Sequence, residues 1–134
     1  MLITVMPALT LLLHSETYAL ATLPPTLPRP EWVRGRFHSV SRSSREWSVI
    51  ADASCVPSDC TSQGGLRCLE VDGEFSLDAV GVVATASAPI AAAGISLFLV
   101  SVWSTDFVFV AQADLFRAVQ ALRDAGHEVR EAPA

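Results

Sequence analysis

Apolar and polar residues follow one another along this chain in blocks that predict alternating strands and helices. Two β-rich apolar runs within residues 94–110 flank a short polar break, which is typical of a buried β-hairpin. Helices are predicted on either side of it, over residues 76–93 and 113–125, and strands outside them, over 66–71 and 127–131. The predicted order is strand, helix, strand, strand, helix, strand, which is the split βαβ or ferredoxin-like plan of the mixed α and β class.

The two predicted helices carry signals for their ends and for the faces that they bury. Either Ser76 or Asp78 can cap the start of the first helix, and Gly94 fits the left-handed position after its end. Pro89 lies inside this helix and is expected to bend it. The predicted buried faces are Val80, Val83, Ala84, Ala88 and Ala91 in the first helix, and Leu115, Ala118, Val119 and Leu122 in the second.

The first half of the chain predicts shorter elements. In order, these are a strand over Tyr18–Leu23, a stiff connector over Pro24–Pro30, a helical turn over Glu31–Arg34, a hairpin of Arg36–Val40 and Trp47–Ala51, and a linker over 52–65. Ser43–Ala51 also resembles Trp103–Ala111, since each has an acid, an aromatic residue and an apolar strand ending in alanine. This short repeat indicates two related small domains, although a match of this length also arises by chance.

Composition places the chain among core-forming proteins and argues against some partners. Hydrophobic residues make up 51% of the 134 residues and charged residues 17%, so the chain is not of the disordered class. The net charge is -5, and the acidic excess lies in the second half without a basic stripe. Nucleic-acid binding, which needs clustered Lys and Arg, is therefore not expected. The sequence has no lysine, which excludes a Schiff-base or P-loop lysine within it.

The apolar residues 1–13 allow two interpretations. They resemble a signal peptide in hydropathy, and Ala19-Leu20-Ala21 fits a cleavage pattern, but a basic leading region is missing and Pro7 interrupts the run. The favoured interpretation is a first strand or hairpin of a cytoplasmic protein. No apolar run reaches the roughly 18 residues that span a bilayer, so no membrane partner is expected.

Cysteine and histidine form no sequence motif for metal binding or catalysis. Cys55, Cys60 and Cys68 are spaced more widely than the paired ligands of a typical zinc site, and the three histidines are scattered. We expect cytosolic thiols, with no metal and no cofactor. The spacing leaves a Cys–His nucleophile pair open as an alternative, although no local motif indicates one.

Several segments resemble a known family. Gly94–Leu115 (GISLFLVSVWSTDFVFVAQADL) and the overlapping Val82–Ser96 resemble the ACT domains of the cytosolic arginine-sensor (CASTOR-like) group and its small bacterial relatives. Phe37–Ser41 and Trp47–Ile50 resemble the first, degenerate domain of that tandem pair. The resemblance covers nearly the whole chain and is strongest over residues 66–126.

The resemblance implies two ferredoxin-like ACT domains, a degenerate one over residues 1–62 and a second over 63–134. It also implies a non-catalytic regulatory protein that binds a small molecule, most often an amino acid, at a domain or subunit interface. A homodimer and a regulated protein partner are expected, and pairing of two copies would cover exposed strand edges. The residues that the resemblance places beside the ligand are Phe75, Ser76, Leu77, Asp78, Gly81, Ser96, Leu97, Trp103, Ser104, Thr105 and Asp106.

The residue chemistry supports this site but leaves other roles open. The helix start offers N–H groups for a carboxylate, while Gly81 either lets a ligand approach or only allows close helix–sheet packing. Asp106 either grips an ammonium group or ends a hairpin turn. Trp103 either walls a pocket or belongs to a core or subunit interface.

One departure from the family affects the choice of ligand. At the helix start, Ala79 stands where the arginine sensors have an acidic side chain after the aspartate. A buried guanidinium needs a paired acid, so arginine is not the default ligand, and a neutral or acidic amino acid, another metabolite or no ligand stay open. Two rival functions also remain: a protein–protein interaction module with a vestigial pocket, and an enzyme that uses an accessible thiol of low pKa or an aspartate.

Overall fold

The computed structural model describes residues 8–76 and 78–134, which form two compact units. One, here called the strand unit, is Glu16–Leu66. The other, here called the ferredoxin-like unit, joins Arg67–Ala134 to the N-terminal residues up to Ser15. The chain thus enters the second unit at residue 67, a few residues after the predicted boundary at 62 and 63, and residues 8–15 lie with the later unit.

The ferredoxin-like unit has the predicted order of strands and helices, and the strand predicted within residues 1–13 is present in it as an additional strand. Its elements are β1 (Thr10–Leu13), the end of β5 (Thr61–Val71), α1 (Val82–Ala92), β6 (Leu97–Ser101), β7 (Asp106–Ala111), the short 3-10 helix Gln112–Asp114, α2 (Leu115–Asp124) and β8 (Glu128–Glu131). Its strands lie in the order β6, β7, β5, β1, β8. The additional strand β1 sits between β5 and β8, and Leu11 is paired with Val71 on one side and Val129 on the other. The mixed α and β class and the ferredoxin-like order are confirmed.

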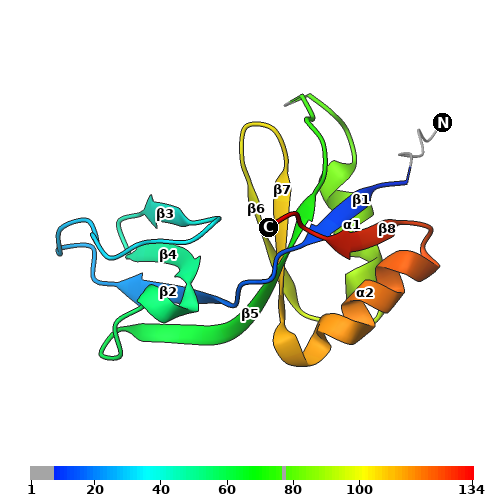
Figure 1. Cartoon of the computed structure of the whole chain (residues 1–134). Coiled ribbons are helices and arrows are strands. Elements are labelled where there is room, and N and C mark those ends of the chain that lie inside the picture. Colours follow the sequence, from blue (N-terminus) through cyan, green and yellow to red (C-terminus); the bar gives the residue numbers. More distant parts are fainter. Residues whose placement is uncertain (1–7, 77) are drawn as a thin grey trace. The chain divides into compact units, whose positions relative to one another are not determined.

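Both helices cover the same face of these strands (Figure 1). The core between them is formed by buried apolar side chains that alternate along each strand and recur at helical spacing on α1 and α2. Its buried members are Leu9, Leu11, Leu69, Val71, Val82, Ala86, Ile90, Ile95, Val108, Val110, Ala118, Leu122 and Val129. The predicted face of α2 is confirmed, because Ala118 and Leu122 are buried and the other two residues pack against this core.

The predicted start and buried face of α1 are wrong. The helix begins at Val82 because Gly81, with φ of 90°, adopts a left-handed conformation that interrupts helical geometry before it. It buries Val82, Ala86 and Ile90, whereas the predicted Val80 is 84% exposed. Because α1 is apolar on nearly all sides, the spacing of its residues does not determine which face the sheet covers.

The strand unit contains β2 (Tyr18–Leu23), β3 (Ser39–Arg42), β4 (Trp47–Asp52), the 3-10 helix Ala53–Cys55 and the first part of β5, in the sheet order β3, β4, β2, β5. The predicted hairpin is confirmed, but its first strand is Ser39–Arg42 and not Arg36–Val40. Its turn is closed by the Ser43 N–H, which donates to the Glu46 carbonyl at 2.9 Å. The predicted helical turn at residues 31–34 is wrong, and so is part of the linker at 52–65, because β5 already begins at Thr61.

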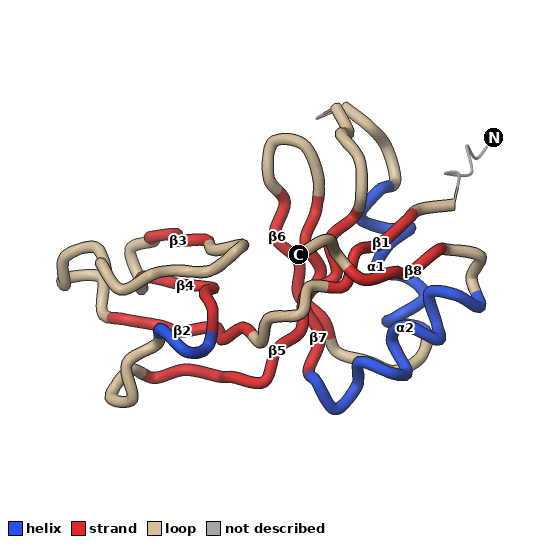
Figure 2. Tube along the Cα trace, viewed as in Figure 1, coloured by secondary structure: helices blue, strands red, loops and turns tan. Residues whose placement is uncertain are grey.

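The strand unit has no α-helix among its described residues, and the short blue segment in it is the 3-10 helix Ala53–Cys55 (Figure 2). The strand–helix–strand order of the other unit is therefore not repeated in it. Across the described part of the chain, no helix is both long enough and apolar enough to cross a membrane.

The face assignment of α2 predicts an asymmetric response to truncation. Leu122→Ala is expected to lower the free energy of unfolding by about 2–5 kcal/mol, because it opens a cavity in the core. Phe116→Ala is the matched control on the same helix: Phe116 is 80% exposed, so its change should stay within about 0.5 kcal/mol. Urea denaturation followed by fluorescence measures both, and equal losses would contradict the assignment.

Candidate ligand site between the hairpin and the first helix

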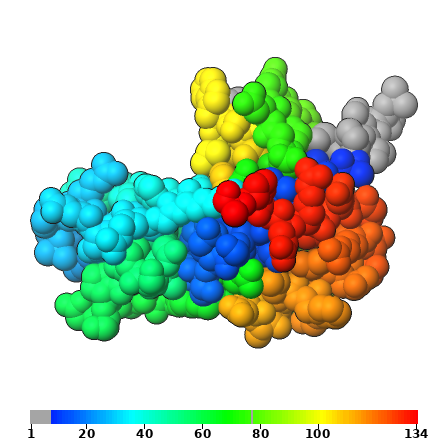
Figure 3. All heavy atoms as spheres, viewed as in Figure 1, coloured from blue at the N-terminus to red at the C-terminus, as the bar shows by residue number. Residues whose placement is uncertain are grey.

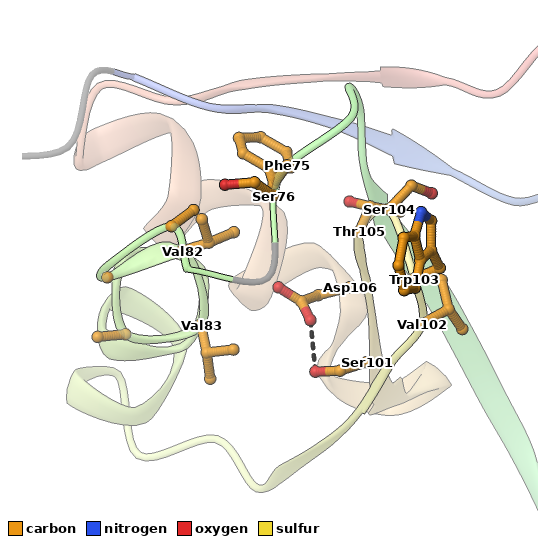
Figure 4. A pocket seen from close by; sticks show the side chains of 13 residues that line it. Phe75, Ser76, Val82, Val83, Ser101, Val102, Trp103, Ser104, Thr105 and Asp106 are labelled. Carbon is orange, nitrogen blue, oxygen red and sulfur yellow. Dashed lines mark hydrogen bonds between the residues drawn. The ribbon is translucent and has the colours of Figure 1, made fainter.

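A cavity of about 520 Å³ lies in the ferredoxin-like unit, between the tip of the β6–β7 hairpin and the start of α1 (Figure 4). Its volume falls in the range of small-molecule sites, roughly 300–1,000 Å³. In the space-filling view, the hairpin tip (yellow) and the segment before α1 (green) stand beside each other at the same end of the unit (Figure 3). The lining residues are Phe75, Ser76, Ala79, Gly81, Val82, Val83, Ala84, Ser101, Val102, Trp103, Ser104, Thr105 and Asp106.

Hydrogen bonds fix the hairpin tip against the end of β5. The Val102 N–H donates to the Thr105 carbonyl at 2.9 Å and closes the turn. The buried Thr105 hydroxyl donates to the Val71 carbonyl at 2.5 Å. The Phe75 N–H donates to the Ser104 carbonyl at 2.6 Å, so the segment before α1 is tied to the same turn. The walls of the cavity are therefore held in place by two backbone hydrogen bonds and the bond from the Thr105 hydroxyl.

Asp106 opens β7 on one wall of the cavity and is the only charged side chain among its described lining residues. It is only 7% exposed. Ser101 is its cross-strand partner, and the Ser101 hydroxyl donates to the Asp106 carboxylate at 2.5 Å (Figure 4). A carboxylate held this way still has acceptor capacity for a cation inside the cavity.

The start of α1 forms the opposite wall. No side chain of the described residues caps this helix, and its first turn has no acidic residue. Helical bonding begins with the Thr85 N–H, which donates to the Gly81 carbonyl at 2.8 Å. The N–H groups of the preceding turn have no intrahelical acceptor, and the residues 82–84 that carry them line the cavity. This wall is suited to an anion.

The structure brings together seven of the eleven predicted site residues. Those that line the cavity are Phe75, Ser76, Gly81, Trp103, Ser104, Thr105 and Asp106. Leu77 lies outside the described residues. Leu97 begins β6 at the opposite end from Ser101, roughly 13 Å away at the rise of a strand, and Ser96 precedes it. Neither is among the described lining residues.

Asp78 is also absent from the described lining. Its carboxylate accepts a hydrogen bond from the Ser76 hydroxyl at 2.5 Å. That bond holds the pKa of the Asp78 carboxyl below its usual range. The side chain is thus engaged with its own turn on the exposed surface.

Sequence reasoning missed Ala79, Val82, Val83, Ala84, Ser101 and Val102 as lining residues. Ser101 had a usable signal, because a four-residue loop places it directly opposite Asp106 in the hairpin ladder. Val82, Val83 and Ala84 had no such signal in the sequence, because their position beside the cavity depends on where α1 begins.

The cysteine and histidine side chains bear on the metal and enzyme alternatives. No group of three or more His, Cys, Asp or Glu side chains there is placed to hold a metal ion. Burial raises the pKa of the Cys60 thiol, and the neighbouring Asp59 carboxylate raises it further. A thiolate nucleophile needs the opposite shift, so Cys60 does not support the enzyme alternative.

Comparison with known proteins matches the part of the chain that carries this cavity. Residues 61–124 match the family model of the ACT domain. The match runs from β5 through α2 and includes every lining residue of the cavity. The ACT part of the predicted resemblance is thereby confirmed for residues 61–124, whereas the CASTOR-like and tandem parts stay predictions. No curated protein matches the chain.

Several solved structures share the fold of this chain. The protein Atu0741 of Agobacterium tumefaciens is 28% identical with a TM-score of 0.88, over 96% of this chain and 97% of that one. VC0802, a protein of unknown function from Vibrio cholerae, is 18% identical with a TM-score of 0.67, over 90% and 91%. The ligand-free regulatory subunit of aspartate kinase from Thermus thermophilus is 11% identical with a TM-score of 0.62, over 86% and 95%. The last two show a likeness of fold alone.

The hydrogen bond from Thr105 predicts a specific loss of stability. Thr105→Val removes the donor and leaves the buried Val71 carbonyl without it, which should cost about 1–3 kcal/mol. Thr105→Ser keeps the hydroxyl and should therefore lower the free energy of unfolding by less than Thr105→Val does. Chemical denaturation gives the free energies, and a Val variant as stable as the Ser variant would contradict an anchoring role for this bond.

Proposed function

We propose that this chain is a non-catalytic regulatory module that binds an amino acid in the cavity between the β6–β7 hairpin and α1. The observation that carries the proposal is the pairing of Asp106 on one wall with the uncapped start of α1 on the other. An amino acid is a zwitterion with an ammonium and a carboxylate a short distance apart. The Asp106 wall is negative and suits the ammonium group, and the start of α1 is the positive end of the helix dipole and suits the carboxylate.

Each contact has a physical basis. A desolvated carboxylate such as Asp106 attracts an ammonium group strongly, through charge-assisted hydrogen bonds. The N–H groups at the start of α1 and the positive end of the helix dipole favour a carboxylate. Ser101 positions Asp106 for this role by its hydrogen bond. Gly81 places no side chain between the ligand and the helix start.

The regulatory role is proposed from the ACT-domain match and from the fold shared with a regulatory subunit of aspartate kinase. A bound amino acid would act by favouring one arrangement of the protein over another. We also propose that the protein is cytoplasmic, that both parts of the chain, 1–62 and 63–134, descend from ACT domains, and that the chain acts on a protein partner.

Apolar side chains beside the cavity support a homodimer. Trp103 lines the cavity and is 81% exposed, and Val80, just before α1, is also largely exposed. Exposed apolar groups of this kind mark interaction surfaces. A second copy of the chain over this end of the unit would cover them and place the ligand at a subunit interface. The same surface favours the second candidate function, an interaction module whose pocket is vestigial.

A thermal-shift screen of the purified protein against the twenty amino acids tests the proposal. A ligand at 100 times its dissociation constant should stabilise the fold by about 2.7 kcal/mol and raise the melting temperature selectively. Asp106→Asn should abolish this rise, because it removes the charge while keeping an acceptor for Ser101. Asp78→Asn is the matched control and should leave the rise intact, since Asp78 does not line the cavity.

Two outcomes would contradict the proposal. A flat screen, with ligand-free protein verified by native mass spectrometry, would favour the interaction module. A rise that Asp106→Asn leaves unchanged would place the ligand elsewhere on the chain.

A further inference from the structure

The described lining of the cavity has one charged side chain, and the proposed function already uses it. Among the described lining residues, only Asp106 is ionisable, and it would pair with the ligand's ammonium group. A ligand with a second cationic group, as in lysine or arginine, would find no second carboxylate there. Enclosing a charge without a partner is strongly unfavourable.

Donors for a second anionic group are also scarce. A hydroxyl group carries a single proton to donate. Three of the four lining hydroxyls already donate within the protein: Ser76 to Asp78, Ser101 to Asp106 and Thr105 to the Val71 carbonyl. The side-chain carboxylate of a ligand such as aspartate or glutamate would therefore be poorly compensated.

Several backbone donors around the cavity are likewise occupied. The N–H groups of Phe75, Ala79 and Val102 donate to carbonyl oxygens of the protein. The N–H groups that remain at the start of α1 are those proposed for the ligand's own carboxylate. Both ends of the zwitterion are thus provided for, and the described lining offers no second charged group for a third charge.

The rest of the lining is apolar. It comes from the segment before α1, the first turn of α1 and the hairpin tip, and consists of Phe75, Ala79, Val82, Val83, Ala84, Val102 and Trp103. Trp103, Val83 and Val102 keep much of their surface exposed. An apolar side chain laid against them would remove that surface from water, which is the main source of favourable free energy in such a site.

From these observations we infer that the cavity selects an amino acid with an uncharged, apolar side chain. This inference rests on the proposed function and narrows it to a class of ligand. Trp103 serves as a hydrophobic cover in it, and not as a platform for a cation.

A homologous series of ligands tests the selectivity. Isothermal titration with alanine, 2-aminobutyrate, norvaline and norleucine varies only the length of the side chain. Affinity should rise about fourfold for each added methylene until the cavity is full. Lysine has the same four-carbon stem as norleucine and should bind at least about tenfold more weakly, because its ammonium lacks a partner.

A pair of variants places the selectivity in the cavity. Val102→Glu adds a carboxylate to the lining at an exposed turn and should shrink the preference for norleucine over lysine by at least about tenfold. Phe116→Glu adds the same charge on an exposed residue of α2, outside the described lining, and should leave the preference unchanged.

The outcomes separate this inference from the proposed function. The inference would be overturned if lysine, arginine, aspartate or glutamate bound in preference to the apolar series. If Asp106→Asn also abolished the binding of that ligand, the proposed function would still stand. The inference would also be overturned if both glutamate variants changed the preference for norleucine over lysine by the same factor. Failure of every amino acid to bind would overturn both.

Discussion

Where β5 ends at Val71, its carbonyl oxygen accepts a hydrogen bond from the buried Thr105 hydroxyl, and this bond fixes the tip of the β6–β7 hairpin. The same turn accepts the Phe75 N–H through the Ser104 carbonyl, which ties down the segment leading to α1. Because the cavity lies between these two segments, its shape depends on both bonds. A buried carbonyl such as that of Val71 must be satisfied, so the hairpin cannot lift away without a cost in free energy.

The opposing walls of the cavity gain their charge in different ways. On the hairpin the charge is an ionisable side chain, Asp106, kept in place by Ser101 across the strand ladder. On α1 the charge is the partial positive charge of the first backbone N–H groups, which have no intrahelical acceptors. Gly81 makes the second wall possible: its left-handed backbone starts the helix at Val82 without contributing a side chain to cap it.

Much of the fold could be predicted from local pattern. The hairpin β6–β7, the strands β2 and β8 and the face of α2 follow from alternation, turn residues and helical spacing, all of which involve neighbours in sequence. The misassigned elements were those where local pattern was uninformative. The nearly uniform apolar surface of α1 gave no preferred face, and the first residues of β5 are polar and glycine-rich, so their pairing with β2 was not visible in the sequence.

The site shows the same division between sequence and tertiary structure. The sequence by itself determined the turn and its chemistry: Trp103, Ser104, Thr105 and Asp106 fall together because they are consecutive in a hairpin. Only the tertiary structure decided that Val82–Ala84 face this turn, that Asp78 does not line the cavity, and that Leu97 and the preceding Ser96 lie at the far end of β6. The physical reason is that the cavity is closed by hydrogen bonds between segments about thirty residues apart, and such long-range contacts leave no periodic trace in sequence.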